Sequence, residues 1–147
     1  DEGYSYEGPV EDQPRNISPA SIVGIPGYRS QNVKMENMEI VSCGGGNPRY
    51  AYRGLTSAEL DSIPEMIARY PEFSQFKELP AWGFYVRHAD GITFENVKFR
   101  AENKDYRPAI VTDDVNGLIL KNVKFEEPNS DKKEQVFTYK TQNVVIE

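Results

Sequence analysis

The sequence predicts an all-β solenoid of about four partial rungs of parallel sheet with a helical insertion, in a single domain spanning residues 1–147. Two observations predict this fold. One segment recurs at a fixed spacing along the chain, and the apolar residues inside each copy alternate with the period of a β-strand. The composition agrees, because nine Tyr and seven Phe beside ten Pro and eleven Gly are typical of strands punctuated by turns.

The repeat is clearest in the second half of the chain. The segment Asp90–Phe99 recurs as Asn116–Phe125, an offset of 116 − 90 = 26 residues. Further partial copies lie at residues 31–40 and 143–147. A third short strand precedes each pair of strands at the same offset, in the segments Phe84–Val86, Ile110–Thr112 and Val136–Thr138, with Ile22–Ile25 as an earlier member. Three strands per repeat of this length fit the window of roughly 20–45 residues for solenoid repeats.

An Asn lies between the two alternating runs of each copy, at Asn37, Asn96 and Asn122. Asn tolerates the left-handed backbone conformation, and its side-chain amide can hydrogen-bond the amide of the next rung. We therefore expect these three residues to stack at one bend as an Asn ladder that fixes the register of the strands.

Two segments lie outside the repeat. Residues 41–81 form an insertion in which the pattern from Thr56 to Glu59 is a capping box, followed by apolar residues at roughly helical spacing. We expect one or two short helices between about residues 57 and 70. Residues 1–20 carry three Pro among acids and tyrosines and are predicted to be an extended arm.

Charge and reactive residues limit the classes of function. A net charge of −6 opposes the basic field that nucleic acid requires, so we expect no nucleic-acid partner. The single Cys43 rules out an internal disulfide and a multi-Cys zinc site, and with His88 as the single His we expect no metal site and no cofactor. No stretch approaches the roughly 18 apolar residues of a membrane span, so we expect no membrane partner.

Several stretches of the chain resemble a known family. They are Glu7-Gly8-Pro9 with Asp12–Arg15, Pro19–Gly27, Tyr70–Phe73 with Glu78–His88, and Asp105–Val111. On these residues nearly the whole chain resembles the C-terminal rungs of bacterial polygalacturonase-like enzymes of glycoside hydrolase family 28, in the pectin-lyase-like superfamily. The resemblance implies a right-handed parallel β-helix, a pectic, uronate-containing polysaccharide as substrate, and a secreted or periplasmic location.

The catalytic signature of that family is not found in this chain. It comprises an Asn-Thr-Asp segment, an Asp-Asp pair, a Gly-His-Gly segment and an Arg-x-Lys segment on consecutive central rungs, and these do not occur here in order. The pair Asp113-Asp114 falls in the turn after the first strand of its rung, whereas the family's pair lies just before that strand. We therefore assign no catalytic residue, expect the hydrolytic aspartates upstream of this chain, and expect this chain alone to be inactive.

Three residues are predicted to contact substrate: Tyr85, Arg87 and Arg107. If the neighbours of Tyr85 point inward, Tyr85 and Arg87 point outward along the first strand of the rung, which carries the cleft in the family. An Arg supplies a forked donor for carboxylates, and aromatic rings supply flat faces for sugars. The alternative for Arg87 is a surface ion pair with Asp113, the residue 26 positions on, worth about 0–1 kcal/mol.

These observations predict the C-terminal β-helix segment of a polygalacturonase-like glycoside hydrolase acting on pectic polysaccharide. Two alternatives stay open: a non-catalytic carbohydrate-binding or structural β-helix module, and a complete small enzyme that uses Asp113 or Asp114. An open end of a solenoid exposes apolar core and unpaired strand edges, so we also expect a homodimer through the first rung near Ile22.

Overall fold

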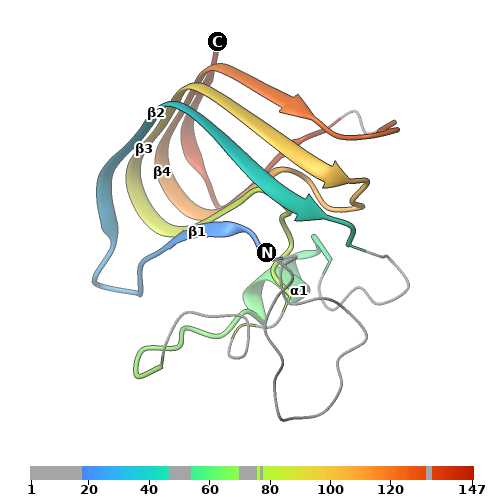
Figure 1. The fold of residues 1–147 in the computed structure, drawn as a ribbon. Helices are drawn as coiled ribbons and strands as arrows, with labels where there is room; N and C mark the ends of the chain where they lie inside the picture. The colour runs from blue at the N-terminus through green and yellow to red at the C-terminus, as the bar shows by residue number, and fades with distance from the viewer. Residues whose placement is uncertain (1–17, 47–53, 70–75, 77, 132–133) are drawn as a thin grey trace.

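The computed structural model describes residues 18–46, 54–69, 76, 78–131 and 134–147, and this part of the chain is mostly β (Figure 1). The elements are β1 (Ala20–Val23), β2 (Ser30–Gly44), α1 (Ser57–Asp61), β3 (Phe84–Asn103), β4 (Ile110–Glu126), β5 (Val136–Tyr139) and β6 (Gln142–Ile146). The named strands form one sheet, and all of their pairings are parallel. The predicted all-β class and the predicted parallel pairing are confirmed.

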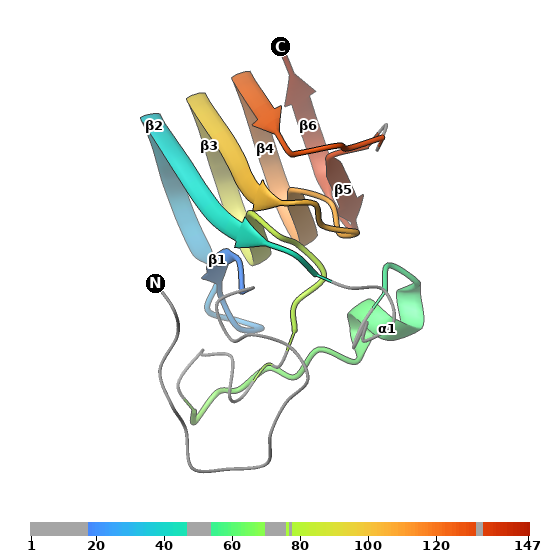
Figure 2. The same cartoon turned by 45° about the vertical axis from the view of Figure 1, so that its right-hand side comes forward.

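The chain passes four times along one path (Figures 1 and 2). β1 and β2 make the first pass, β3 the second, β4 the third, and β5 with β6 the fourth. β3 pairs with β1 and β2 on one side and with β4 on the other, and β4 pairs in turn with β5 and β6. Phe84 of β3 lies beside Ile110 of β4, and Ile110 lies beside Val136 of β5. The predicted offset of 26 residues is therefore the register of the sheet from β3 onward.

The long strands bend where the sequence places its Asn residues. Asn37, Asn96 and Asn122 have φ of 54°, 53° and 49°, the left-handed conformation. The side-chain amide of Asn96 donates to Oδ1 of Asn37 at 3.0 Å, and that of Asn122 donates to Oδ1 of Asn96 at 2.8 Å. The predicted Asn ladder is confirmed, and we call this bend the Asn corner.

A second left-handed bend, the Gly corner, aligns Asn32, Gly91, Gly117 and Asn143, whose φ values run from 55° to 84°. A Cβ atom on Gly91 would approach Oδ1 of Asn32 to 2.8 Å, a contact that the flexible Asn32 side chain can relieve, so the left-handed conformation is what favours glycine here. The sequence analysis did not predict this bend, although the same residues open each copy of the repeat.

A third left-handed bend, the His88 corner, consists of His88, Asp114 and Lys140, with φ of 50°, 54° and 45°. His and Asp are enriched among non-glycine residues in this conformation, whereas a long side chain such as Lys is uncommon there. At the His88 corner, titratable side chains, rather than Asn or Gly, therefore occupy the strained backbone positions.

Along each strand the side chains alternate in direction, and the apolar ones that point inward form a core shared by the passes. Phe94 and Phe99 of β3 are fully buried in it. Phe94 meets Phe84 edge to face, with ring centroids 5.1 Å apart, and Phe99 stacks on Phe125 of β4 with centroids 5.6 Å apart. Equivalent positions of successive passes thus pack on one another, which is the packing that a repeat in register requires.

The insertion starts later than predicted. β2 continues to Gly44, because Val41 still pairs with Arg100 of β3. Helix α1 begins at Ser57, directly after Thr56, the N-cap of the predicted capping box, in which Thr56 and Glu59 exchange hydrogen bonds. Within the described residues, no helix is long and apolar enough to cross a membrane. Of the predicted arm at residues 1–20, only residues 18–20 are described, and the last of these already belongs to β1.

We expect Asn96→Ala to lower the free energy of unfolding by about 2 kcal/mol, because Ala is disfavoured in the left-handed region by roughly 1–2 kcal/mol and two ladder hydrogen bonds are lost. Asn96→Gly loses the hydrogen bonds but keeps the backbone conformation, so it should cost about 1 kcal/mol less. The free energy of unfolding of both variants is measured by urea denaturation, with the fluorescence of the buried Trp82 as the signal. Lys124→Ala, an exposed change on β4, is the control, and an unchanged stability of Asn96→Ala would contradict the structural role of the ladder.

Candidate functional site

The candidate site lies where the first part of β3 and β4 meets the His88 corner. Its outer face is covered by the segment of residues 55–69, which we call the covering segment. Leu60 and Ile63 of this segment are buried in a second apolar cluster with Tyr85 and Val111. This cluster is separate from the core between the passes, so the first part of β3 is packed on both faces.

Tyr85 and Arg87 lie on the outer face, as predicted, but that face is not an open cleft. Tyr85 is 0% exposed and Arg87 is 6% exposed, because the covering segment and neighbouring insertion residues pack over them. Arg107 lies in the loop between β3 and β4 and is 1% exposed. The expectation that this face is open is therefore wrong. Contact of these three residues with a substrate stays a prediction.

Arg87 holds the covering segment to the sheet. Its Nη1 donates to the carbonyl oxygen of Ile63 at 2.6 Å, and its Nη2 lies 3.2 Å from Oε1 of Glu65. Its Nε pairs with Oδ2 of Asp113 at 3.2 Å, without the alignment of a hydrogen bond. The predicted pair of Arg87 with Asp113 is present, but it is buried rather than at the surface. Burial raises the pKa of Asp113, and the guanidinium of Arg87 opposes this shift.

His88 lies between two carboxylates. Its Nδ1 is 2.6 Å from Oδ2 of Asp114, and its Nε2 is 3.0 Å from each oxygen of Glu65. Burial acts to raise the pKa of Asp114, but hydrogen bonds from His88 and Arg29, together with their charges, outweigh burial and hold that pKa below its ordinary value. Asp114 is therefore suited to stay ionised as an acceptor.

Arg29, in the turn between β1 and β2, was missed by the sequence analysis. Its guanidinium donates to both carboxylate oxygens of Asp90, to Oδ2 of Asp114 at 2.5 Å, and to the carbonyl oxygens of Ala89 and Asp114. The hydrogen bond to Asp90 is the largest of the effects that raise the pKa of Arg29. Arg29 thus connects the first pass to the second and third. A sequence signal for it existed: if the copy at residues 31–40 is extended by two positions toward the N-terminus, Arg29 aligns with His88.

A second buried ion pair fixes the loop that carries Arg107. Asp105 accepts from Nε and Nη2 of Arg107 at 2.9 and 2.7 Å, and from the backbone amides of Arg107 and Gly46. Burial acts to raise the pKa of Asp105, but Arg107 and the two amides outweigh it and lower that pKa. Beside this pair, Tyr106 donates a hydrogen bond to Glu78, and burial raises the pKa of Tyr106.

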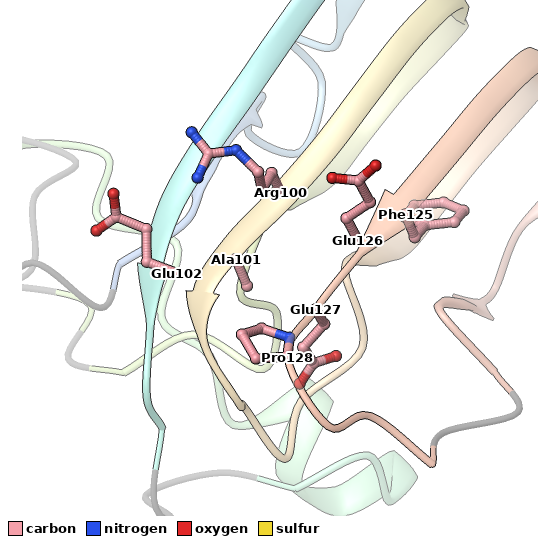
Figure 3. Close-up of a pocket in the computed structure, with 7 residues that line it drawn as sticks. All are labelled: Arg100, Ala101, Glu102, Phe125, Glu126, Glu127 and Pro128. Carbon is pink, nitrogen blue, oxygen red and sulfur yellow. The ribbon is translucent and has the colours of Figure 1, made fainter.

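Two hollows lie away from the His88 corner. The larger, of about 620 Å³, opens at the ends of β3 and β4 (Figure 3) and is lined by Arg100, Ala101, Glu102, Phe125, Glu126, Glu127 and Pro128. Glu126 pairs with Lys98 at 2.8 Å, and Glu127 accepts from the backbone amide of Asp105 at 2.6 Å. The smaller, of about 240 Å³, is mostly apolar and is lined by Gly54, Leu55, Pro80, Tyr106, Arg107 and Pro108. Arg107, a predicted site residue, thus borders the smaller hollow.

Among the described residues, the His, Cys, Asp and Glu side chains form no group of three or more that could hold a metal ion. Cys43, the single Cys of the chain, is partly buried. At and beside the His88 corner, the guanidinium groups of Arg29 and Arg87 and the ring of His88 hold carboxylates. Comparison of the chain with protein-family models, with curated proteins and with solved structures finds no match.

We expect Asp105→Asn to lower the free energy of unfolding by about 3–5 kcal/mol near neutral pH, because it leaves the Arg107 charge buried without its partner. The lowered pKa of Asp105 means that its contribution is present above the unfolded-state pKa and is lost as pH falls through the folded-state pKa. The variant should therefore lose less stability than the wild type between about pH 5 and pH 2.

Urea unfolding across this pH range measures both effects. Asp131→Asn removes a carboxylate whose side chain is 88% exposed and serves as the control. An acid-induced loss of stability that is the same in Asp105→Asn and in the wild type would refute the assignment.

Proposed function

We propose that the parallel sheet is part of a right-handed β-helix, and that this chain is a segment of a polygalacturonase-like glycoside hydrolase acting on pectic polysaccharide. In this proposal the hydrolytic aspartates lie on turns upstream of the chain, and the protein works in a secreted or periplasmic location where the polymer is found.

The observation that carries the proposal is the edge of the first pass. Among the described residues, β1 and β2 pair only with β3, so within this part of the chain no strand pairs with their other edge. β1 is in register with β3, since Ala20 lies beside Phe84. A further turn added at this edge would place its first strand beside β1, and its outward side chains would continue the same outer face.

The contacts of Asp113 and Asp114 support the part of the proposal that places the catalytic centre upstream of this chain. Hydrolysis of a glycosidic bond with inversion needs an acid and a base roughly 6.5–9.5 Å apart, with room for the sugar and a water molecule. Asp113 is 2% exposed, and Asp114 is held by His88 and Arg29. Both carboxylates are thus committed to contacts within the fold.

A second candidate is a non-catalytic carbohydrate-binding or structural β-helix module. The burial of Tyr85, Arg87 and Arg107 favours it, because the aromatic and cationic side chains of the outer face are then used to hold the insertion.

We expect this chain to release no reducing ends from polygalacturonate, and a longer polypeptide that contains the upstream turns to release them. A reducing-end assay on both polypeptides measures this. Turnover by the chain alone that disappears in Asp113→Asn would establish the small-enzyme alternative. Binding of polygalacturonate without turnover by the longer polypeptide would establish the non-catalytic module.

We also propose that two copies of this chain associate through the free edge of β1 and β2. Sedimentation velocity at rising concentration should show a dimer. Ser21→Lys, at an exposed position of β1, should weaken the dimer, because a charged side chain at a sheet edge opposes pairing. Gln142→Lys, an exposed change on β6, is the matched control. A monomer at every concentration would contradict the proposal.

A further inference from the structure

The carboxylate of Glu65 lies in a site built by two consecutive residues of β3. Arg87 approaches Oε1 of Glu65 to 3.2 Å, and Nε2 of His88 is 3.0 Å from each of its oxygens. The side chain of Glu65 is 31% exposed, whereas those of Arg87 and His88 are 7% and 11% exposed. The carboxylate therefore lies at the mouth of the site, and the Arg87 guanidinium and the His88 ring form its floor.

Both donors are oriented by contacts other than Glu65. Arg87 is held by the carbonyl oxygen of Ile63 and by Asp113, and His88 is held by Asp114 and by its left-handed backbone. Removal of the Glu65 carboxylate would leave these contacts in place. The site is thus preorganised for a carboxylate, a condition that reduces the free-energy cost of binding one.

We propose that Arg87 and His88 form a carboxylate receptor, which Glu65 occupies from within the chain and which the carboxylate of a uronic acid residue can occupy in its place. The uronic acid as ligand rests on the proposed function, and the receptor itself rests on the geometry. Glu65 competes at an effective concentration on the order of millimolar, because it is tethered to the chain. Wild-type protein therefore binds a free uronate weakly.

The test uses sodium galacturonate as the probe and the full chain as the protein. Glu65→Ala should bind galacturonate about tenfold or more tightly than the wild type, since the internal competitor is gone. Titration calorimetry gives the affinity, and the NMR signals of the His88 ring report contact, because His88 is the single His of the chain. Glu36→Ala, which removes an exposed carboxylate paired with Lys34, should bind as the wild type does.

Arg87→Lys in the Glu65→Ala background should abolish the gain, because the forked donor is lost. Glu65→Gln removes the charge at nearly the same volume, and it provides the comparison with the wild type if the Ala variant does not fold. Neutral galactose should leave the His88 signals unchanged.

The outcomes separate the receptor from the proposed function. Tighter binding of galacturonate than of acetate supports both the receptor and the uronic acid as its ligand. Equal gains for acetate and galacturonate support the receptor and overturn the uronic acid as its ligand. If folded Glu65→Ala or Glu65→Gln shows no gain in affinity for galacturonate, the receptor is overturned. The proposed function is then still tested separately, by the reducing-end assay on the longer polypeptide.

Discussion

Left-handed backbone at equivalent positions of successive passes is the constraint on which the rest of the structure depends. A side chain on a strand points inward or outward by its parity, so a bend displaced by one residue would turn every following side chain to the wrong face. The Asn corner and the Gly corner prevent this, because their residues accept the left-handed conformation and stack in register. The apolar core is a consequence, since Phe94 and Phe99 reach it only when the bends lie where they do.

The His88 corner meets the same requirement with charged residues, and this difference connects the corner to the insertion. Lys140 adopts a φ of 45° without the conformational freedom of Gly. Its Nζ pairs with Asp61 of α1 at 2.7 Å, and this hydrogen bond is the largest of the effects that lower the pKa of Asp61. Two passes earlier along the chain, His88 holds Glu65 in the same way. Two of the strained positions therefore also fasten the covering segment.

The parts that the sequence predicts are those governed by the repeat. An offset of 26 residues was enough to align β3 with the later strands, to stack Asn96 on Asn122, and to pair Arg87 with Asp113. Asn37 was placed by the matching pattern of residues 31–40, which lies 59 residues before the copy in β3. The covering segment has no counterpart in the repeat, so the repeat spacing does not predict which face of the sheet this segment covers. Its burial of Arg87 therefore could not be predicted, and Arg29 was missed because it lies in a turn outside the alternating runs.

The covering segment is held in two ways that differ in strength, and this difference decides which movement a ligand requires. Leu60 and Ile63 are almost fully buried, and burial of each is worth about 1.5–3 kcal/mol, so lifting the whole segment would cost several kcal/mol. Glu65 contributes no apolar burial of this kind, and its side chain is already partly exposed. A rotation of that one side chain would release the atoms of Arg87 and His88 that contact it, while the apolar contacts of the segment remain. Exchange of carboxylates at the mouth of the site is thus compatible with a rigid fold beneath it.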